Sequence, residues 1–419
     1  MKNSKRIIFE LNEFNVDLLE ESSSSRPYLK KILNSNKINT KIPDSYESDY
    51  LEPWSQWVSI HTGKRTLDHK IKHLGDVGKL RYPEIWDNSP DDFGVIWGCL
   101  NSKSPKSNEV TYFPDPWTKS SNTNLKTLQK LEHFLRLAVS DRGDGFFKKI
   151  YGVSRLVYAG IKIAPFLLSN LDMRFVKLII KTYPSVLLNI SSIYACIEYL
   201  AFNKFLKVSS IRNKSVDVFF ANMQAHCQHY YWGTKNHARI DFSLDLIELM
   251  LSKLFAKYHE VVMINGLTQE YSADKEVWNI FYPKIGWEKF ILNFVGKNIN
   301  VQPCMSYDAI LRFETEYQLE EAIKKINAIT HIESKKNIFL IERYDDDCMK
   351  LFIRFNYTGL DEGNISTCTG EYSFIDLFTK LATRTARHIP ICNVFLNFNL
   401  ETEYQYNWEL IDLYKPSDV

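Results

Sequence analysis

Short apolar runs alternate with longer helical patterns along most of the chain. Residues 6–9, 94–99, 216–220 and 260–264 are nearly continuous runs of hydrophobic β-formers, which is typical of strands that are buried on both faces. Their wide spacing leaves room for a helix between successive strands. The pattern therefore predicts an α/β fold in which a central, mostly parallel sheet is sandwiched by helices.

The pattern changes between residues 125 and 210, where amphipathic stretches such as 156–171 and 186–202 predict long helices. Lys162 interrupts the first stretch, and the second carries Glu198 and is short for a membrane-spanning helix. Two interpretations are open for this region. It is either a helical insertion or cap on the α/β core, or a segment that contacts a membrane surface.

A small α+β unit is predicted beyond residue 297. Residues 309–313, 337–342 and 349–355 have strand-like patterns, and residues 319–329 have a helical one. We therefore expect five consecutive segments: the first part of the α/β core, the helical insertion or cap, the rest of the core, a small α+β subdomain and a C-terminal return to the core. Their bounds are 1–124, 125–210, 211–297, 298–370 and 371–419.

Composition limits the class of protein. The chain has 419 residues, of which 45% are hydrophobic and 14% aromatic, so it can bury a large core. Its formal net charge is only +2, so we expect no nucleic-acid partner. The apolar run after the basic N-terminus is too short for a signal peptide. Seven scattered cysteines include no Cys-x-x-Cys pair, and together these features favour a cytoplasmic protein, membrane-peripheral if residues 125–210 contact a membrane.

Two histidines give the first indication of chemistry. His226 and His229 directly follow the apolar run 216–220, and open α/β folds place their sites at the ends of such strands. An imidazole titrates near neutrality after only a modest shift of its pKa, so His229 is a candidate general acid or base.

Four segments resemble the alkaline-phosphatase superfamily of phosphate and sulfate ester hydrolases and transferases. The first strand ends in Glu10 where the family has a metal-binding aspartate, and residues 52–63 are similar to its nucleophile helix. Residues 225–232 are similar to its Asp-x-x-x-His element, and residues 385–390 to the segment with its late metal-binding histidine, here His388. The resemblance implies the family's fold over most of the chain.

The chain departs from the family at the positions that carry its usual chemistry. Pro53 stands where the family has a Thr or Ser nucleophile, Ala225 replaces the aspartate of Asp-x-x-x-His, and Asn265-Gly266 replaces Asp-His. A two-metal mechanism needs several ligands for each ion, so we expect no two-metal site. The resemblance places His388 near His226 and His229, and these three imidazoles could hold at most one divalent, zinc-like ion.

Other polar and aromatic side chains are expected beside these histidines, because buried polar groups without partners are costly. Glu10 and Glu13 are three residues apart. If a helix began there, they would share a face and could form an acid and base pair. If Asn12 were the N-cap of that helix, Glu13 would merely lie in its first turn. Asp115 is either a carboxylate that a rigid, proline-bracketed loop directs into the site or part of an Asp-Pro turn. The candidate catalytic residues are His229, Glu10, Glu13 and His226, and the candidate substrate-binding residues are Asn12, Gln56, Trp57, His61, Asp115, Trp117, Asn265 and Gln269.

Two functions remain open at this point. The resemblance, to a branch associated with bacterial surface-polysaccharide gene clusters, implies an enzyme that transfers or hydrolyses a phosphorylated, sulfated or nucleotide-activated sugar. The missing nucleophile and ligands favour the alternative, a catalytically inactive glycan-binding, phosphate-binding or scaffold protein of the same fold. In both cases the expected partner is a glycan or an activated sugar.

Overall fold

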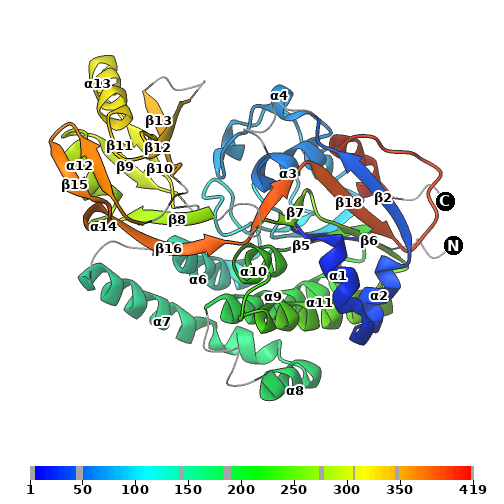
Figure 1. Ribbon diagram of the computed structural model, residues 1–419. Coiled ribbons are helices and arrows are strands. Elements are labelled where there is room, and N and C mark those ends of the chain that lie inside the picture. Colours follow the sequence, from blue (N-terminus) through cyan, green and yellow to red (C-terminus); the bar gives the residue numbers. More distant parts are fainter. Residues whose placement is uncertain are drawn as a thin grey trace. The chain divides into compact units, whose positions relative to one another are not determined.

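The computed structural model describes residues 5–43, 51–140, 146–182, 190–272, 278–304, 307–344, 349–357, 359 and 361–416 (Figure 1). Its contacts divide the chain into two compact units. The larger unit is formed by Met1–Ala138, Val157–Tyr271 and Ala386–Val419, and the smaller by Val139–Leu156 and Ser272–Thr385. The smaller unit includes the predicted α+β segment 298–370 and continues beyond it on both sides.

A seven-stranded sheet forms the centre of the larger unit. Its strands are, in spatial order, β2 (Asn36–Lys41), β18 (Ile391–Leu396), β6 (Glu260–Ile264), β1 (Arg6–Leu11), β5 (Val216–Ala221), β3 (Phe93–Trp97) and β4 (Thr111–Phe113). The pairs from β6 to β4 are parallel, whereas β18 pairs antiparallel with both β6 and β2. The predicted α/β fold with a central, mostly parallel sheet is therefore confirmed.

The apolar runs form the middle of this sheet because both of its faces are covered. Every residue of β1 is buried, and β1 lies between β5 and β6 with Glu10 opposite Phe220 and Ile264. β3 ends at Trp97, earlier than the apolar run suggested, because Gly98 follows with a φ of +74°. Such a positive φ is readily adopted by glycine and turns the chain out of the strand.

Helices cover the sheet on both sides. Figure 1 shows α9 and α11 on one side of the sheet and α3 on the other. The helices that begin in the larger unit are α1 (Val16–Ser22), α2 (Pro27–Leu33), α3 (Pro53–Thr62), α4 (Thr66–His69), α5 (Ile85–Asn88), α6 (Gln129–Ser140), α8 (Met173–Thr182), α9 (Ile190–Arg212), α10 (Met223–Tyr231) and α11 (Ala238–Lys257). The C-terminal 3₁₀ helix η5 (Asn407–Tyr414) packs against α3.

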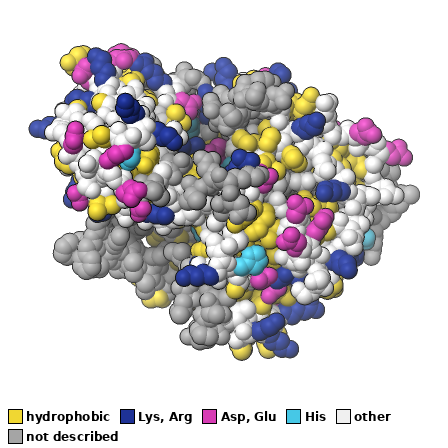
Figure 2. Space-filling view, in the orientation of Figure 1, with side chains coloured by type: hydrophobic (Ala, Val, Ile, Leu, Met, Phe, Trp, Pro, Cys, Tyr) yellow, Lys and Arg dark blue, Asp and Glu magenta, His cyan; other side chains and the backbone are white. Residues whose placement is uncertain are grey.

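The described residues between 125 and 210 are mostly helical, as the pattern predicts. This region contains α6, α7 (Phe146–Ser169), α8 and most of α9. Within the described residues, no helix combines the length and the apolar character that crossing a membrane would require. On the face of the molecule shown in Figure 2, acidic and basic side chains are interspersed.

The smaller unit has its own hydrophobic core, built around Trp287, Phe290 and Phe339. Its main sheet has the order β12 (Phe339–Arg343), β13 (Lys350–Phe355), β10 (Ala309–Arg312) and β9 (Asn300–Pro303). Further elements are β8 (Trp278–Pro283), α12 (Trp287–Phe294), α13 (Glu316–Asn327), β11 (Thr330–His331), β14 (Asn364–Thr367), β15 (Gly370–Ser373), α14 (Phe374–Leu377) and β16 (Phe378–Arg384). In the larger unit, β7 (Thr268–Tyr271) pairs antiparallel with β17 (Ala386–Ile389).

Candidate metal centre

Three residues from distant parts of the chain meet at one point in the larger unit. Glu13 lies in the turn after β1, His229 lies on α10 and His388 lies on β17. One carboxylate oxygen and the two imidazole nitrogens lie within 4.8 Å of one another, which is a spacing that could hold a metal ion. Glu13 is 3% exposed, and both histidines are largely buried.

The backbone of Glu13 is held in an uncommon conformation. Its φ is +57°, in the left-handed region that L-residues seldom occupy. Its N–H donates to the carbonyl of Asn265 at 2.9 Å, and its carbonyl accepts from Nε2 of Gln228 at 2.9 Å. The chain turns here before α1, whose N-cap is Asn15. No helix begins at residues 10–13, so the condition for placing Glu10 and Glu13 on one helix face is not met, and Asn12 is not an N-cap.

The Glu13 carboxylate is surrounded by donors. Oε2 lies 3.0 Å from Nε2 of His229 and 3.1 Å from Nε2 of His388, and it also accepts from Nε2 of Gln269. Oε1 accepts from Nδ2 of Asn12 at 3.0 Å. Burial alone would raise the pKa of Glu13, but the charge of His388 and the hydrogen bonds of both histidines hold it well below its usual range. The carboxylate is therefore ionised at neutral pH.

A second layer of contacts holds the ligand-forming side chains. Trp57 donates from Nε1 to Oδ1 of Asn12 at 2.8 Å, and Asn12 donates in turn to Oδ1 of Asn222 at 2.8 Å. Gln269 also donates to the carbonyl of Ala225 at 3.1 Å. The structure thus brings the candidate residues Asn12, Trp57 and Gln269 to the surroundings of Glu13, where they orient its carboxylate.

His226 does not join this cluster. Its Nε2 lies 2.8 Å from Oγ of Ser191 on α9, and Ser191 also contacts the hydroxyl of Tyr231 at 3.0 Å. The expected set of three imidazoles is therefore corrected, with Glu13 in the place of His226. Both histidines lie on α10, but His226 contacts Ser191 of α9 whereas His229 contacts Glu13.

Glu10 belongs to a separate, fully buried cluster. Its Oε1 lies 2.8 Å from Nε2 of His61 and accepts from the hydroxyl of Tyr414 at 2.6 Å. All three residues have no exposed surface. Glu10 and Glu13 therefore do not form the conditional acid and base pair, because Glu10 is still part of β1 whereas Glu13 follows the turn. Tyr414 was not among the predicted residues, and nothing in its local sequence links it to position 10.

Several other predicted site residues have structural partners. Asp115 accepts backbone N–H bonds from Asn101, Trp117 and Thr118 at 2.8–3.0 Å, which makes it part of a turn. Gln56 accepts from Nδ2 of Asn407 at 2.6 Å. Asn265 donates to the carbonyl of Phe14 and accepts from the N–H of Asn393, both at 2.8 Å. Burial raises the pKa of Asp115 despite its hydrogen bonds.

A small cavity of about 40 Å³ lies where β3, β4 and β5 end, beside α9. Nε1 of Trp117 is buried there, and no described residue accepts a hydrogen bond from it. Glu198 on the cavity wall accepts the N–H groups of Asn222 and Met223 at 2.8 Å each, at the start of α10. Burial raises the pKa of Glu198 to about 7. The aromatic lining includes Trp97, Phe113, Trp117, Tyr194 and Phe220.

Comparisons with known proteins found solved structures whose similarity to this chain is low. No protein-family model and no curated protein match the sequence. Phosphonoacetate hydrolase from Sinorhizobium meliloti, solved with phosphonoformate and with phosphonoacetate, is 11% and 12% identical, and each match covers 99% of this chain and 95% of that chain with a TM-score of 0.45. Murine ectonucleotide pyrophosphatase/phosphodiesterase 5 is 9% identical, with 98% and 93% coverage and a TM-score of 0.42. Similarity this low assigns neither a family nor an activity to the chain.

Proposed function

We propose that this chain is an enzyme that holds one divalent, zinc-like cation between Glu13, His229 and His388. It acts by hydrolysis or transfer on a phosphorylated, sulfated or nucleotide-activated sugar in the biosynthesis of bacterial surface polysaccharides. The metal site rests on the geometry around His388. The substrate class and the biological setting rest on the four sequence segments that resemble the alkaline-phosphatase superfamily.

The hydrogen bond of His388 to the backbone carries the proposal. Nδ1 of His388 lies 2.9 Å from the carbonyl oxygen of Leu51, which can only accept, so Nδ1 carries a proton. A neutral ring then presents a lone pair at Nε2, which faces Oε2 of Glu13 at 3.1 Å. Two lone pairs at this distance repel each other unless a cation neutralises them. That cation is either a second proton on His388 or a metal ion.

A metal ion fits this arrangement in two respects. Metal-bound histidines commonly donate their other N–H to a carbonyl or carboxylate, as His388 does to Leu51. Tetrahedral zinc with bonds of about 2.0–2.1 Å would place its ligand atoms roughly 3.3 Å apart, close to the 3.0 and 3.1 Å separations between Glu13 and the two histidines. Three protein ligands are typical of catalytic zinc sites, which keep one position open.

The chemistry supplied by such a cation is Lewis-acid polarisation of an ester oxygen. The chain's own residues hold the ligands in place: Asn12 and Gln269 fix the Glu13 carboxylate, and Leu51 fixes the ring of His388. This arrangement agrees with the general requirement that the residues of a catalytic site be held in place by a rigid second layer of contacts.

We propose that the attacking oxygen comes from outside the protein, because neither Pro53 nor Ser55 offers one. Pro53 is the first residue of α3 and has no hydroxyl, and Ser55 is fully buried with its hydroxyl donated to the carbonyl of Ile71 at 2.7 Å. The attacking group is therefore water in a hydrolysis or an acceptor hydroxyl in a transfer.

Zinc titration of the chelator-treated full-length protein tests the metal site. We expect calorimetry to give one equivalent of bound zinc. Glu13→Gln and His388→Gln should weaken zinc binding by roughly tenfold or more, since each removes a ligand or its charge. His226→Gln, on the same helix as His229 but bonded to Ser191, is the matched control and should bind zinc like the wild type. Absence of stoichiometric zinc binding, or equal binding by all variants, would refute the proposal.

A substrate panel separates the enzyme from the alternative of a non-catalytic binding protein, which the absence of a hydroxyl at Pro53 favours. The zinc-loaded protein is incubated with a nucleotide-activated sugar, a sugar phosphate, a sugar sulfate and an acceptor glycan, and products are measured by mass spectrometry. The enzyme proposal predicts turnover that Glu13→Gln removes and His226→Gln retains. Zinc binding and ligand binding without any product would instead support the non-catalytic function.

A further inference from the structure

We infer that the outward face of α7 and α8 binds the surface of an anionic lipid bilayer, with a lipid phosphate held in the cavity between α6 and α7. This surface is separate from the metal centre and does not depend on the proposed function. We call it the lipid face. It consists of the exposed side chains Tyr158, Ile161, Lys162, Pro165, Leu168, Met173, Arg174, Lys177, Ile180 and Lys181.

The α7 part of the lipid face is apolar where a surface helix is normally polar. Tyr158, Ile161 and Leu168 are 61%, 67% and 68% exposed. Together with Lys162 and Pro165 they follow the spacing i, i+3, i+4, i+7 and i+10, which places them on one side of the helix. A continuous stripe of large apolar side chains facing water marks an interaction surface.

The α8 part combines apolar and cationic side chains. Met173 and Ile180 are 69% and 71% exposed, and Arg174, Lys177 and Lys181 are exposed on the same side. The opposite side of α8 is anchored, because Phe175 is buried and stacks on Tyr199 with ring centroids 4.9 Å apart. The helix therefore packs against the protein with one face and exposes the other face to solvent.

Charge identifies the partner as anionic. Residues 157–182 contain four basic residues and a single acidic one, Asp172, whereas the whole chain has 52 basic and 50 acidic residues. The Asp172 carboxylate accepts from Nζ of Lys253 at 2.6 Å and from the hydroxyl of Tyr199 at 2.7 Å, so it is already paired. A second copy of the same face would bring cations against cations. An anionic bilayer would attract the cations through its head groups and bury the apolar stripe at the edge of its acyl chains.

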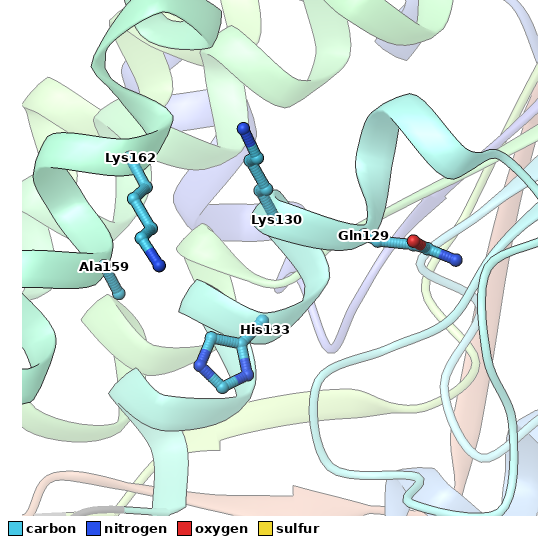
Figure 3. A pocket seen from close by; sticks show the side chains of 5 residues that line it. All are labelled: Gln129, Lys130, His133, Ala159 and Lys162. Atoms are coloured by element: carbon cyan, nitrogen blue, oxygen red, sulfur yellow. The ribbon is translucent and has the colours of Figure 1, made fainter.

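A cavity beside the stripe has the chemistry of a phosphate site. It measures about 190 Å³ and is lined by Gln129, Lys130 and His133 of α6 and by Ala159 and Lys162 of α7. Figure 3 shows the imidazole of His133 and the amino group of Lys162 extending into the same space from the two helices. Lys162 belongs to both the stripe and the cavity. A lipid phosphate in the cavity would thus leave its acyl chains beside Ile161 and Leu168.

Co-sedimentation of the full-length protein with vesicles tests this inference. We expect binding to phosphatidylcholine vesicles that contain phosphatidylglycerol, little binding to phosphatidylcholine alone, and weaker binding at high salt. Two double variants probe the two components: Ile161→Asn with Leu168→Asn, and Lys177→Glu with Lys181→Glu. Each pair should reduce the bound fraction at limiting lipid by roughly tenfold. Lys162→Ala probes the cavity and should also weaken binding.

Matched controls are available on exposed positions of the smaller unit. Leu340→Asn and Lys335→Glu change side chains of the same kinds and should bind vesicles like the wild type. Zinc affinity and the melting temperature should be unchanged in all variants, which separates this inference from the metal site and from misfolding. Equal sedimentation with neutral and anionic vesicles, no sedimentation at all, or loss of binding in the controls would overturn it. Binding of glycerol phosphate without binding of vesicles would also overturn it, because it would show a site for a free phosphate.

Discussion

Gly266 shows how a single residue supports the metal centre. Its φ is +70°, and a Cβ at this position would lie 2.7 Å from Cε2 of Trp57. Trp57 holds Asn12, which in turn holds the carboxylate of Glu13. The absence of a side chain at position 266 therefore lets the indole reach the position from which it orients the site.

We predict that Gly266→Ala lowers both stability and zinc affinity. The added methyl would displace Trp57 and strain the left-handed backbone, at a cost of about 1–3 kcal/mol in the free energy of unfolding. Urea denaturation and zinc calorimetry measure the two effects. Gly370→Ala is the control, because its φ is also positive and no atom lies within 4 Å of the added Cβ. Equal losses in both variants would show that backbone strain alone is responsible.

A second prediction concerns the buried hydroxyl of Tyr414. Tyr414→Phe removes a 2.6 Å hydrogen bond to Glu10 inside a fully buried cluster. Removing a donor from a buried carboxylate costs about 1–3 kcal/mol. Tyr317→Phe, at a tyrosine that is 75% exposed, should cost almost nothing. Indistinguishable urea midpoints for the two variants would contradict this account of Tyr414.

Sequence reasoning at the residue scale identified the right residue types but not their partners. Glu13 and His229 were candidates as polar side chains near apolar strands, and His388 was a candidate through the resemblance of residues 385–390 to a metal-binding segment. Which carboxylate meets the histidines depends on the turn that places Glu13 at a positive φ, and an aspartate, asparagine or glycine would be the usual signal for such a turn. Glutamate is not, so nothing in the local residue pattern distinguishes Glu13 from Glu10.

Among the secondary-structure elements, α3 depends on a neutral histidine at its side. Nδ1 of His69 accepts the N–H of Ile71 at 3.0 Å, so its proton lies on Nε2, which contacts Oγ of Ser59 on α3 at 3.0 Å. Burial lowers the pKa of His69 from 6.5 to about 4, against an opposing effect of Asp68. Protonation would remove the acceptor for Ile71 and place a charge in the interior.

We predict a pH dependence of stability from this group. Its folded-state pKa lies below its unfolded value, so its contribution is complete above pH 6.5 and is lost as the pH falls toward 4. The total contribution of His69 to the free energy of unfolding is about 3 kcal/mol, since one pKa unit corresponds to about 1.4 kcal/mol. His69→Asn should flatten the wild-type decline in the free energy of unfolding over this range, whereas His237→Asn should not. Identical pH profiles for wild type and His69→Asn would be inconsistent with a buried neutral imidazole.

The first turn of α3 also leads to a prediction about activity. With Pro53 as its first residue and the Ser55 hydroxyl donated to the carbonyl of Ile71, this first turn offers no nucleophile. We expect the zinc-loaded protein to hydrolyse simple aryl phosphates slowly or not at all, and to form no covalent phosphoprotein. Ser55→Ala should leave any turnover of sugar substrates unchanged. Rapid, zinc-stimulated release of an aryl alcohol that Ser55→Ala abolishes would contradict this.

Strands were easier to predict than the elements between them. β1, β5 and β6 coincide with apolar runs in the sequence, because strands that are buried on both faces consist mainly of hydrophobic residues. β2 shows no such run, because most of its residues are exposed at the edge of the sheet. The pattern placed His226 and His229 after the strand 216–220 without predicting their secondary structure; residues 223–231 form α10, and His226 contacts Ser191 of α9.

At the scale of the whole molecule, the described part of the chain is held together without disulfide bonds. The six cysteines described there, Cys99, Cys196, Cys227, Cys304, Cys368 and Cys392, are all free thiols. A disulfide would stabilise the protein by restricting its unfolded state. We therefore predict that dithiothreitol leaves the melting temperature unchanged in calorimetry. A clear fall in the melting temperature on reduction would reveal a covalent link.

The strand order of the large sheet determines when the metal centre can form during synthesis. β18 is the last strand made, yet it lies between β2 and β6, and His388 is translated shortly before it. A nascent chain that already contains Glu13 and His229 still lacks the third ligand and leaves an edge of β6 unpaired. Exposed strand edges promote aggregation. If the proposed cation binds here, a chain that ends before residue 388 lacks one of its three ligands, so the site is complete only after β17 has been translated.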